Sequence, residues 1–378
     1  MRLKRSRIAA RGPALAAIAW LAASTAPAPA QNLSVADYEP RSTLVVEAHP
    51  TTRARFPFVD VHGHLRALDA AEVARLVVEM DALNMAAIVN LSGGSGDRLR
   101  AAVAATRGPH AARFATFATL SYDGIDQAGY GERTADALER DVREHGAVGL
   151  KIFKNLGMFT RDTAGRRVPT DDPRLDPVWR RCAELRIPVL IHTGEPSPFW
   201  LPWDRFNERW LELAEFPDRR REDPRFASFE QTMGEQHSLF RRHPGTTFIS
   251  AHLGWLGNDL GRLGRLLDEL PNVNVELGAV LAELGRQPRT AREFLIRYQD
   301  RVLMGKDGPF EPTEYHVYFR VLETTDEYFD YYRRRHAHWK MYGLDLPDAV
   351  LRRIYHENAL RIVPGLDRSL LTAAPAPP

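Results

Sequence analysis

Short apolar runs alternate with amphipathic segments along most of the chain. The runs are rich in Val, Ile, Leu and Phe and are bounded by polar or turn-forming residues, a pattern that predicts buried strands. The pattern gives eight predicted strands, at 58–61, 86–91, 113–120, 147–153, 187–192, 246–252, 272–277 and 301–306. Segments with helical periodicity or strong helix formers lie between them, at 71–83, 132–145, 172–185, 228–242, 256–270, 288–299 and 347–362.

Such an alternation predicts an α/β fold in the form of a parallel (β/α)8 TIM barrel. An open doubly wound sheet would show the same order of elements. However, no Gly-x-Gly-x-x-Gly turn follows the first predicted strand, as it would in the dinucleotide-binding form of that sheet. We therefore expect a closed ring of strands.

Two connections are longer than a barrel requires: 193–227, after the fifth predicted strand, and 308–346, after the eighth. Both leave from the carboxyl-terminal face of the barrel, where long loops commonly determine specificity. Both are rich in aromatic residues, most of which we expect to pack the loops onto the barrel or against a second copy in a homo-oligomer. Trp200, in the first insertion, is the aromatic residue assigned to substrate contact.

Composition limits the classes of partner and the compartment. The 378 residues are 44% hydrophobic and 26% charged, with a formal net charge of +2. This ordinary globular composition gives no sign of a nucleic-acid partner, and we expect none. Residues 1–30 combine a basic start, an apolar stretch and small residues, which predicts a signal peptide. We expect a secreted or periplasmic protein with no membrane association beyond export, and an uncleaved anchor is the alternative.

The rest of the chain divides into a polar leader at 31–56, the barrel at 57–365 and a disordered tail at 366–378. Cys182 is the single cysteine. It therefore has no partner for an intramolecular disulfide, and cysteine-based zinc sites are excluded. Because it falls within a predicted helix, we expect it to be buried.

Side chains that bind metals stand at the ends of four predicted strands. His62 and His64 follow the first strand, His192 and His252 end the fifth and sixth, and Asp307 follows the eighth. Every strand of a parallel barrel ends at the same face, so ligands far apart in sequence meet there. The spacing of His62 and His64 also places both imidazoles on one side of an extended strand. One such histidine is as readily a core or loop residue, but together they predict a single metal site.

The motifs resemble the amidohydrolase superfamily. Within it, they are similar to the amidohydrolase-2 group, which holds metal-dependent hydrolases and aminocarboxymuconate-semialdehyde-type decarboxylases. The resemblance covers residues 57–365 and is specific for the superfamily but not for a reaction. It is carried by His62-Gly63-His64, Gly149-Leu150-Lys151, Ile191-His192-Thr193, Ser250-Ala251-His252-Leu253-Gly254, Gly305-Lys306-Asp307-Gly308-Pro309 and the closing Ile354-Tyr355-His356-Glu357-Asn358-Ala359-Leu360-Arg361.

The resemblance implies that His62, His64, His192 and Asp307 bind one divalent ion, with His252 beside it as a catalytic or accessory ligand. Three imidazoles and one carboxylate suit zinc, while manganese, iron or cobalt also fit. The resemblance gives Asp307 the further role of general base.

Two lysines near this site are open to more than one interpretation. Lys151 is implied to be catalytic, either binding a substrate carboxylate or donating to an oxyanion. A carbamylated Lys151 that bridges two ions is the alternative. Lys306 stands where the family has a small hydroxyl residue. Strand alternation places it opposite Asp307 and predicts that it points out of the barrel wall. Were it to face the site, it would lower the Asp307 pKa and favour an anionic substrate.

Two further residues are candidates for substrate binding. Glu195 lies just beyond the fifth predicted strand and can bond a substrate hydroxyl or bound water, or else anchor the loop that follows. Arg66 follows the first two histidines and can pair with a carboxylate, although a solvent-facing arginine is the commoner case.

We expect hydrolysis of an ester, lactone or amide-like bond in a small polar metabolite by a metal-activated water. Non-oxidative decarboxylation of an aromatic or unsaturated carboxylic acid is the alternative, and a secreted barrel that binds metal or ligand without turnover is the second. A Ser/His/Asp hydrolase is not supported because no Gly-x-Ser-x-Gly elbow is present. We expect the glycine-rich turn at 93–96 instead to shape the pocket floor or to bind an anion through its backbone N–H groups.

Overall fold

The computed structural model describes residues 33–66 and 68–371, and the chain divides into two units after Leu44. The predicted signal peptide lies outside the described residues. Residues 33–44 of the first unit contain a turn and no helix or strand. The second unit, from Val45 onwards, contains the predicted barrel.

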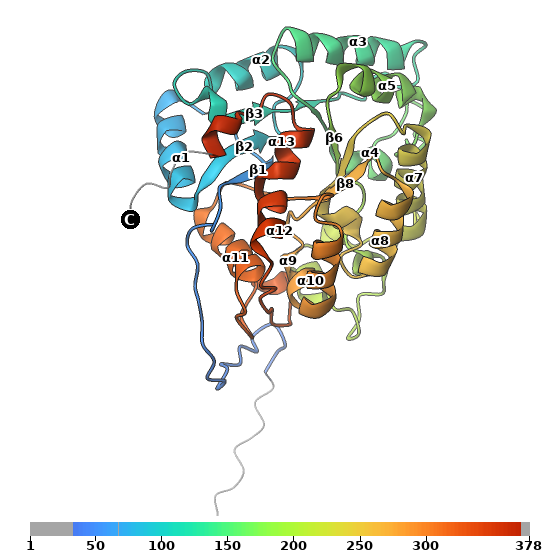
Figure 1. Ribbon diagram of the computed structural model, residues 1–378. Coiled ribbons are helices and arrows are strands. Elements are labelled where there is room, and N and C mark those ends of the chain that lie inside the picture. Colours follow the sequence, from blue (N-terminus) through green and yellow to red (C-terminus); the bar gives the residue numbers. More distant parts are fainter. Residues whose placement is uncertain (1–32, 67, 372–378) are drawn as a thin grey trace, which may run out of the picture. The chain divides into compact units, whose positions relative to one another are not determined.

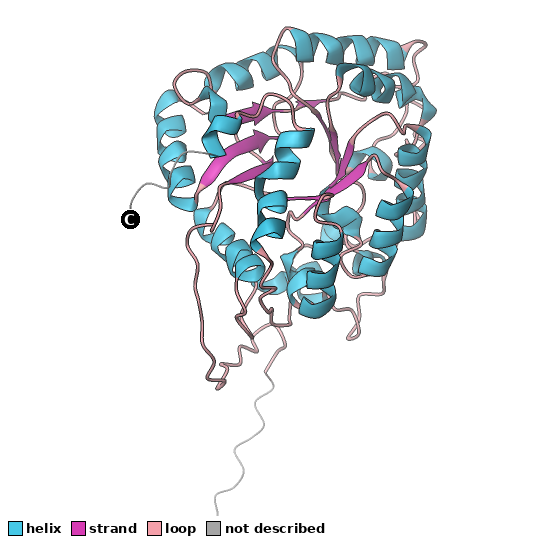
Figure 2. Cartoon of the chain, in the orientation of Figure 1, coloured by secondary structure: helices cyan, strands magenta, loops and turns pink. Residues whose placement is uncertain are grey.

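Short parallel strands form the centre of this unit, and helices surround them (Figures 1 and 2). The hydrogen-bonded order is β1-β2-β3 in one sheet and β4-β5-β6-β7-β8-β9 in the other. The strands are β1 (Phe58–Gly63), β2 (Met85–Asn90), β3 (Phe114–Thr116), β4 (Ala118–Thr119), β5 (Leu150–Ile152), β6 (Val189–Ile191), β7 (Phe248–Ser250), β8 (Val273–Glu276) and β9 (Val302–Leu303).

Backbone hydrogen bonds continue the ring where the two sheets meet. The N–H of Phe117, between β3 and β4, donates to the carbonyl of Asn90 at 2.9 Å. At the other junction, the N–H of Val61 in β1 donates to the carbonyl of Met304, just after β9, at 3.0 Å. β3 and β4 are thus one predicted strand interrupted at a single residue. The architecture is the predicted TIM-barrel fold.

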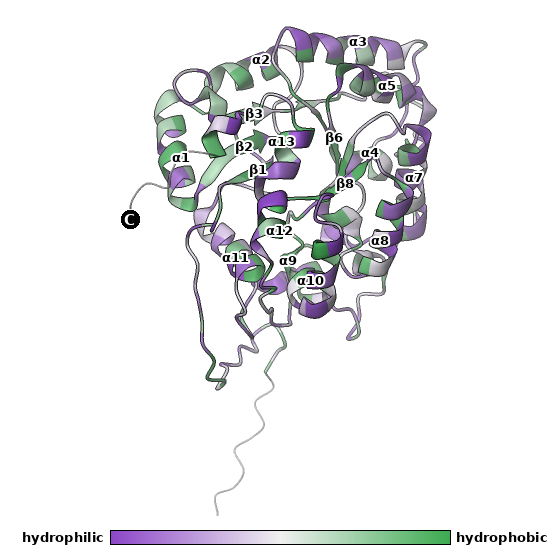
Figure 3. Ribbon diagram, in the orientation of Figure 1, coloured by the Kyte–Doolittle hydropathy of each residue, from purple (hydrophilic) through white to green (hydrophobic). Residues whose placement is uncertain are grey.

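The outer layer consists of amphipathic helices whose apolar sides face the strands. Figure 3 shows hydrophilic residues along outer helices such as α3 and α7. The helices of this layer are α1 (Ala70–Leu83), α2 (Gly96–Ala105), α3 (Tyr130–Arg143), α5 (Asp176–Leu185), α7 (Phe229–Arg242), α8 (Leu260–Glu269) and α10 (Pro288–Arg297). The layer ends with α12 (Asp348–Arg352), a π-helical turn (Arg353–Glu357) and α13 (Asn358–Ile362).

Helix α1 illustrates how the sequence sets these boundaries. Asp69 caps its first turn, accepting from the Glu72 N–H while the Glu72 side chain accepts from the Asp69 N–H. This capping box satisfies two amide groups that would otherwise lack partners. The helix ends at Asn84, which adopts a left-handed conformation with φ 67°. The helix therefore spans 70–83, within one residue of the segment 71–83 that the periodicity predicts.

Both long insertions contain helices of their own. The first holds 3-10 turns at Ser197–Trp200 and Pro217–Arg219, and helix α6 (Trp210–Glu215). The second holds α11 (Pro312–Glu323) and a 3-10 turn at Arg334–His336. Shorter helices follow β5 and β8, namely α4 (Asn155–Met158) and α9 (Leu281–Gly285). The insertions contact each other, since Arg209 Nη1 donates to the carbonyl of His336 at 2.6 Å.

Three sequence expectations outside the site have structural outcomes. Cys182 is buried in α5 and free, as expected, and burial raises the pKa of its thiol. Residues 366–371, expected to belong to a disordered tail, include a 3-10 turn at Arg368–Leu371, and 372–378 lie outside the described residues. Within the described residues, no helix has the length and apolar character needed to span a bilayer.

Candidate metal centre

His62, His64 and Asp307 meet at the carboxyl ends of β1 and β9. Oδ1 of Asp307 lies 3.5 Å from His62 Nε2 and 3.3 Å from His64 Nε2. The N–H of Asp307 donates to the carbonyl of His62 at 3.2 Å, which ties the end of β9 to β1. Asp307 adopts a left-handed φ of 67°, a conformation that aspartate tolerates better than most residues. Three ligand atoms are therefore close enough to hold one ion.

His192 and His252 complete the predicted group. His252 Nε2 lies 3.3 Å from His192 Nδ1 and 4.0 Å from Asp307 Oδ2. His192 Nε2 is buried and has no hydrogen-bond partner among the described residues. A buried imidazole nitrogen without a partner is costly unless a ligand is meant to occupy it. Among the predicted ligands, the structure thus groups His62, His64 and Asp307 directly, and His192 adjoins this group through His252.

A left-handed turn presents His252 to the site. Four consecutive residues, from His252 to Trp255, have φ values of 58°, 53°, 59° and 54°. A left-handed backbone is unfavourable for residues other than glycine. Such a run therefore persists only where the surrounding structure holds it in place. The turn stacks the Trp255 ring on His252, with ring centroids 4.4 Å apart. Trp255 also borders His192, at 5.7 Å between ring centroids.

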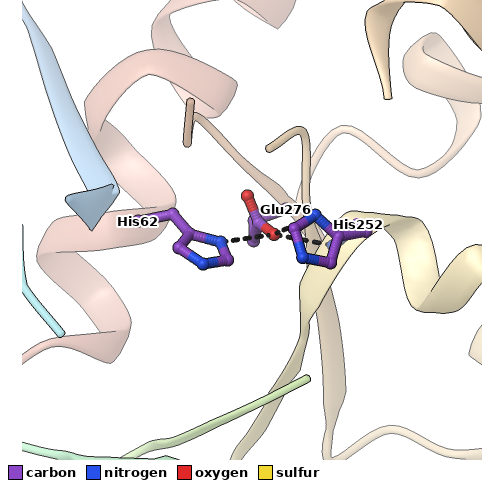
Figure 4. A group of neighbouring side chains, drawn as sticks. All are labelled: His62, His252 and Glu276. Atoms are coloured by element: carbon purple, nitrogen blue, oxygen red, sulfur yellow. Dashed lines mark hydrogen bonds and ion pairs between the residues drawn. The ribbon is translucent and has the colours of Figure 1, made fainter. Parts of the chain in front are cut away.

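Glu276, at the end of β8, is a site residue that the sequence reasoning missed. Its Oε1 accepts from His62 Nδ1 at 2.9 Å and from the His252 N–H at 2.7 Å. Figure 4 shows the carboxylate lying between the two imidazoles. Its other oxygen accepts from the Gly278 N–H at 2.5 Å. A carboxylate on Nδ1 fixes the tautomer of His62 and leaves Nε2 to face a metal.

The signal for Glu276 was present in the sequence, because the seventh predicted strand, 272–277, carries a glutamate at its carboxyl end. The neighbouring glycines are required by this carboxylate. A Cβ at Gly278 would lie 2.7 Å from Glu276 Oε2, and a Cβ at Gly305 would clash with the same oxygen. The Gly305 of the Gly-Lys-Asp motif therefore makes room for Glu276.

Burial sets the protonation of the histidines. It lowers the pKa of His62 and of His192 well below the usual value, and lowers that of His252 to about 4. These imidazoles are therefore neutral near pH 7 and have a lone pair for a metal. Burial alone would raise the pKa of Asp307, but His62, His64 and His252 hold it well below its usual range. Neutral imidazoles with an ionised carboxylate are a donor set that fits a divalent cation.

Two cationic side chains border this cluster. Lys151, in β5, is buried, and its Nζ lies 3.2 Å from His62 Nε2. Burial lowers its pKa to about 8, against the attraction of Asp307 and Glu276, so most of it is charged near neutral pH. Arg333, in the second insertion, donates through Nη2 to the main-chain carbonyl of Asp307 at 3.2 Å. Sequence reasoning did not identify Arg333, because its position depends on how the insertion folds back.

The Lys306 side chain points towards α11 and not towards the histidines, as strand alternation predicts, although its Nζ also lies 3.5 Å from the main-chain carbonyl of Asp307. Its side chain contacts Glu314 of α11, and its Nζ donates to the carbonyl of Pro309 at 2.8 Å. The Nζ also lies 5.4 Å from the centre of the Tyr315 ring. Lys306 therefore fastens α11 to the barrel.

The three residues predicted to bind substrate have other partners or face solvent. Glu195 is buried, with Oε1 2.5 Å from Lys154 Nζ and 3.8 Å from Arg221 Nη2. Trp200 Nε1 donates to the carbonyl of Ala227 at 2.8 Å, which fastens the first insertion. Arg66 is exposed. In the described part of the chain, no hydrogen bond, ion pair or ring contact joins these three residues to the histidines or Asp307.

Comparison with known proteins agrees with this geometry. The family model described as amidohydrolase matches residues 46–365. A search of curated protein sequences finds no match. Among solved structures, 2,6-dihydroxybenzoate decarboxylase in complex with 2,6-dihydroxybenzoate is 17% identical, with 81% of this chain and 99% of that chain covered and a TM-score of 0.50.

A dihydroxybenzoic acid decarboxylase from Polaromonas, with bound manganese and the inhibitor 2-nitroresorcinol, is 16% identical. The alignment covers 81% of this chain and 96% of that chain, with a TM-score of 0.51. At these identities the likeness shows a shared fold. The family match spans most of the chain and includes every residue of the histidine and aspartate cluster, so this chain belongs to the amidohydrolase family.

Proposed function

We propose that the protein is a metal-dependent enzyme that removes carbon dioxide from a small aromatic or unsaturated carboxylic acid. The observation that supports this most is the charge around the cluster. Lys151 and Arg333 place two cationic groups beside the neutral imidazoles and Asp307, and the nearby Glu276 carboxylate is bonded to His62. Such an environment favours an anionic substrate. The fold supports the reaction, because two proteins that share it are named as decarboxylases.

His62, His64, His192 and Asp307 would hold one divalent cation, for which zinc and manganese are both compatible with the donor set. When bound, the cation supplies positive charge that neutralises and orients the substrate's anionic oxygens. Lys151 adds a hydrogen-bond donor for the same group. Burial of these residues strengthens each interaction because water is excluded.

His252 is placed to carry the proton that the reaction consumes. Its Nδ1 lies 2.7 Å from the carbonyl of Gly278, which holds a proton on that nitrogen and leaves Nε2 to accept and release another. When the carbon–carbon bond breaks and carbon dioxide leaves, the carbon must gain one proton. His252 is neutral at rest, so its Nε2 first takes this proton from solvent and then delivers it to the carbon, which returns the imidazole to its neutral form.

Hydrolysis, which the sequence favours, is the second candidate. The observation in its favour is the low pKa of Asp307, since an ionised carboxylate beside the imidazoles can accept a proton from an attacking water. A small lactone or ester would be the substrate.

Product analysis distinguishes the two reactions. Purified protein loaded with manganese or zinc is incubated with a panel of aromatic mono- and dicarboxylic acids and a panel of lactones, while carbon dioxide and acid release are recorded. The proposal expects carbon dioxide from a member of the acid panel and a loss of at least 100-fold in kcat in Asp307→Asn and His252→Gln. Arg241→Gln, which removes an exposed ion pair with Glu269, is the control and should keep full activity.

Acid release from a lactone without carbon dioxide would replace decarboxylation with hydrolysis. A folded, metal-loaded protein that turns over neither panel would support the non-catalytic alternative and reject this proposal.

A further inference from the structure

A basic pocket lies between the two insertions. It has a volume of about 530 Å³ and is lined by Arg219, Arg333, Arg334, Arg335 and His336, with Phe216 and Glu215. Its size is that of a site for a small molecule. One side chain connects this pocket to the metal centre, because Arg333 lines the pocket and also donates to the carbonyl of Asp307.

Arg333 differs from the arginines around it in its partners. Arg219 pairs with Glu212 at 2.7 Å, and Arg335 lies 3.8 Å from Glu215. Arg333 has no carboxylate within ion-pair distance in the described part of the chain. Its guanidinium donates to the Asp307 carbonyl, lies 5.4 Å from the centre of the Tyr332 ring and is attracted by the Asp307 charge. A half-buried guanidinium with no carboxylate in direct contact can pair with an anionic ligand.

The position of Arg333 is held by both insertions. Arg209 fixes the carbonyl of His336, and His336 Nδ1 lies 3.3 Å from Glu212 Oε1. On the barrel side, Gly308 has φ 102°, and a Cβ there would come within 3.1 Å of Arg333 Nη2. The chain therefore leaves room for this guanidinium and fastens the segment that carries it.

The hydrogen bond to Asp307 also sets the direction of the guanidinium. Nη2 bonds the main-chain carbonyl and not the carboxylate, so the Asp307 side-chain oxygens remain available to the metal centre. The remaining N–H groups have no partner in the described residues. A planar guanidinium with free N–H groups suits a carboxylate, which accepts two parallel hydrogen bonds.

We propose that this basic pocket is a carboxylate subsite in which Arg333 binds a non-reacting acidic group, so that the substrate is a dicarboxylate. The inference rests on the proposed function, in which the reacting carboxylate lies at the histidines and Lys151. Arg333 is then the residue that selects dicarboxylates over monocarboxylates.

Binding measurements on the metal-loaded full chain test this without requiring turnover. The probes are benzoate, with one carboxylate, and isophthalate and terephthalate, with two in different spacings, titrated by calorimetry. We expect at least one dicarboxylate to bind wild type roughly 10- to 100-fold more tightly than benzoate. Arg333→Met should remove this preference, and Arg333→Lys should restore part of it.

Arg241→Gln is the control, because it removes an exposed arginine that pairs with Glu269 and does not line this pocket, and it should keep the preference. Circular dichroism and melting temperature of each variant confirm folding. Equal affinity for all three probes in wild type, or a preference that survives in Arg333→Met, would overturn the proposal.

Inorganic phosphate is a further probe in the same binding titrations. Arg333-dependent binding of phosphate without any preference for dicarboxylates would show a site for a free anion, which also overturns it. These outcomes are separate from those of the proposed function, since carbon dioxide release by wild type does not depend on the binding preference.

Discussion

At the scale of single residues, the clustering of the predicted ligands follows from the sequence, whereas the contacts that support them do not. His62, His64 and Asp307 lie together, and His192 contacts His252, because these side chains stand at strand ends, where a barrel gathers them. Glu276 bonds His62 through a contact between strands that no sequence spacing reveals. The substrate-binding roles of Glu195 and Trp200 stay predictions. Glu195 pairs with Lys154, which follows β5, and Trp200 bonds Ala227 within the first insertion.

Glu276 gives the sharpest residue-scale prediction. In Glu276→Gln the amide keeps the size of the carboxylate but carries no charge. Its oxygen therefore accepts hydrogen bonds from His62 and His252 less strongly. We expect metal affinity to fall by roughly 10- to 100-fold, with the fold retained. Competition against a metal chelator measures the dissociation constant. Glu269→Gln, at an exposed ion pair with Arg241, is the control, and equal affinities in the two variants would argue against this role of Glu276.

At the scale of elements, the apolar pattern predicted strand and helix type better than length. The run at 113–120 is one predicted strand but is interrupted at Phe117, because the ring of hydrogen bonds changes partner there. Helix α2 was not predicted, since only Leu99 is buried along it and its apolar stripe is weak. The turn at 252–255 also escapes prediction, because only Gly254 of its four residues favours left-handed backbone.

The carboxyl end of α5 offers an element-scale test. Arg186 follows the helix in a left-handed conformation, with φ 54°, and its side chain is exposed. Glycine adopts this conformation without strain, so Arg186→Gly should raise the free energy of unfolding by about 0.5–1 kcal/mol. Arg186→Val should lower it by at least as much, because a β-branched side chain opposes positive φ. Urea denaturation measures both, and a destabilised glycine variant would contradict the capping argument.

At the scale of the whole molecule, the closed ring explains why ligands so far apart in sequence form one site. His62 in β1 and Asp307 after β9 belong to the first and last strands. They become neighbours because the backbone of Val61 bonds Met304 and that of Asp307 bonds His62. This convergence followed from the alternation of strands and helices. The contact between the insertions did not, because it depends on side-chain pairs such as Arg209 with His336.

The central claim is that this ring gathers His62, His64, His192 and Asp307 around one divalent cation. Crystals grown with manganese, measured at a wavelength where manganese scatters anomalously, locate the ion directly. The account predicts one anomalous peak per chain, bonded to these four side chains, with Glu276 bonded to His62 and not to the ion. A peak held instead by His252 and Glu276, or no peak at this face of the barrel, would contradict it.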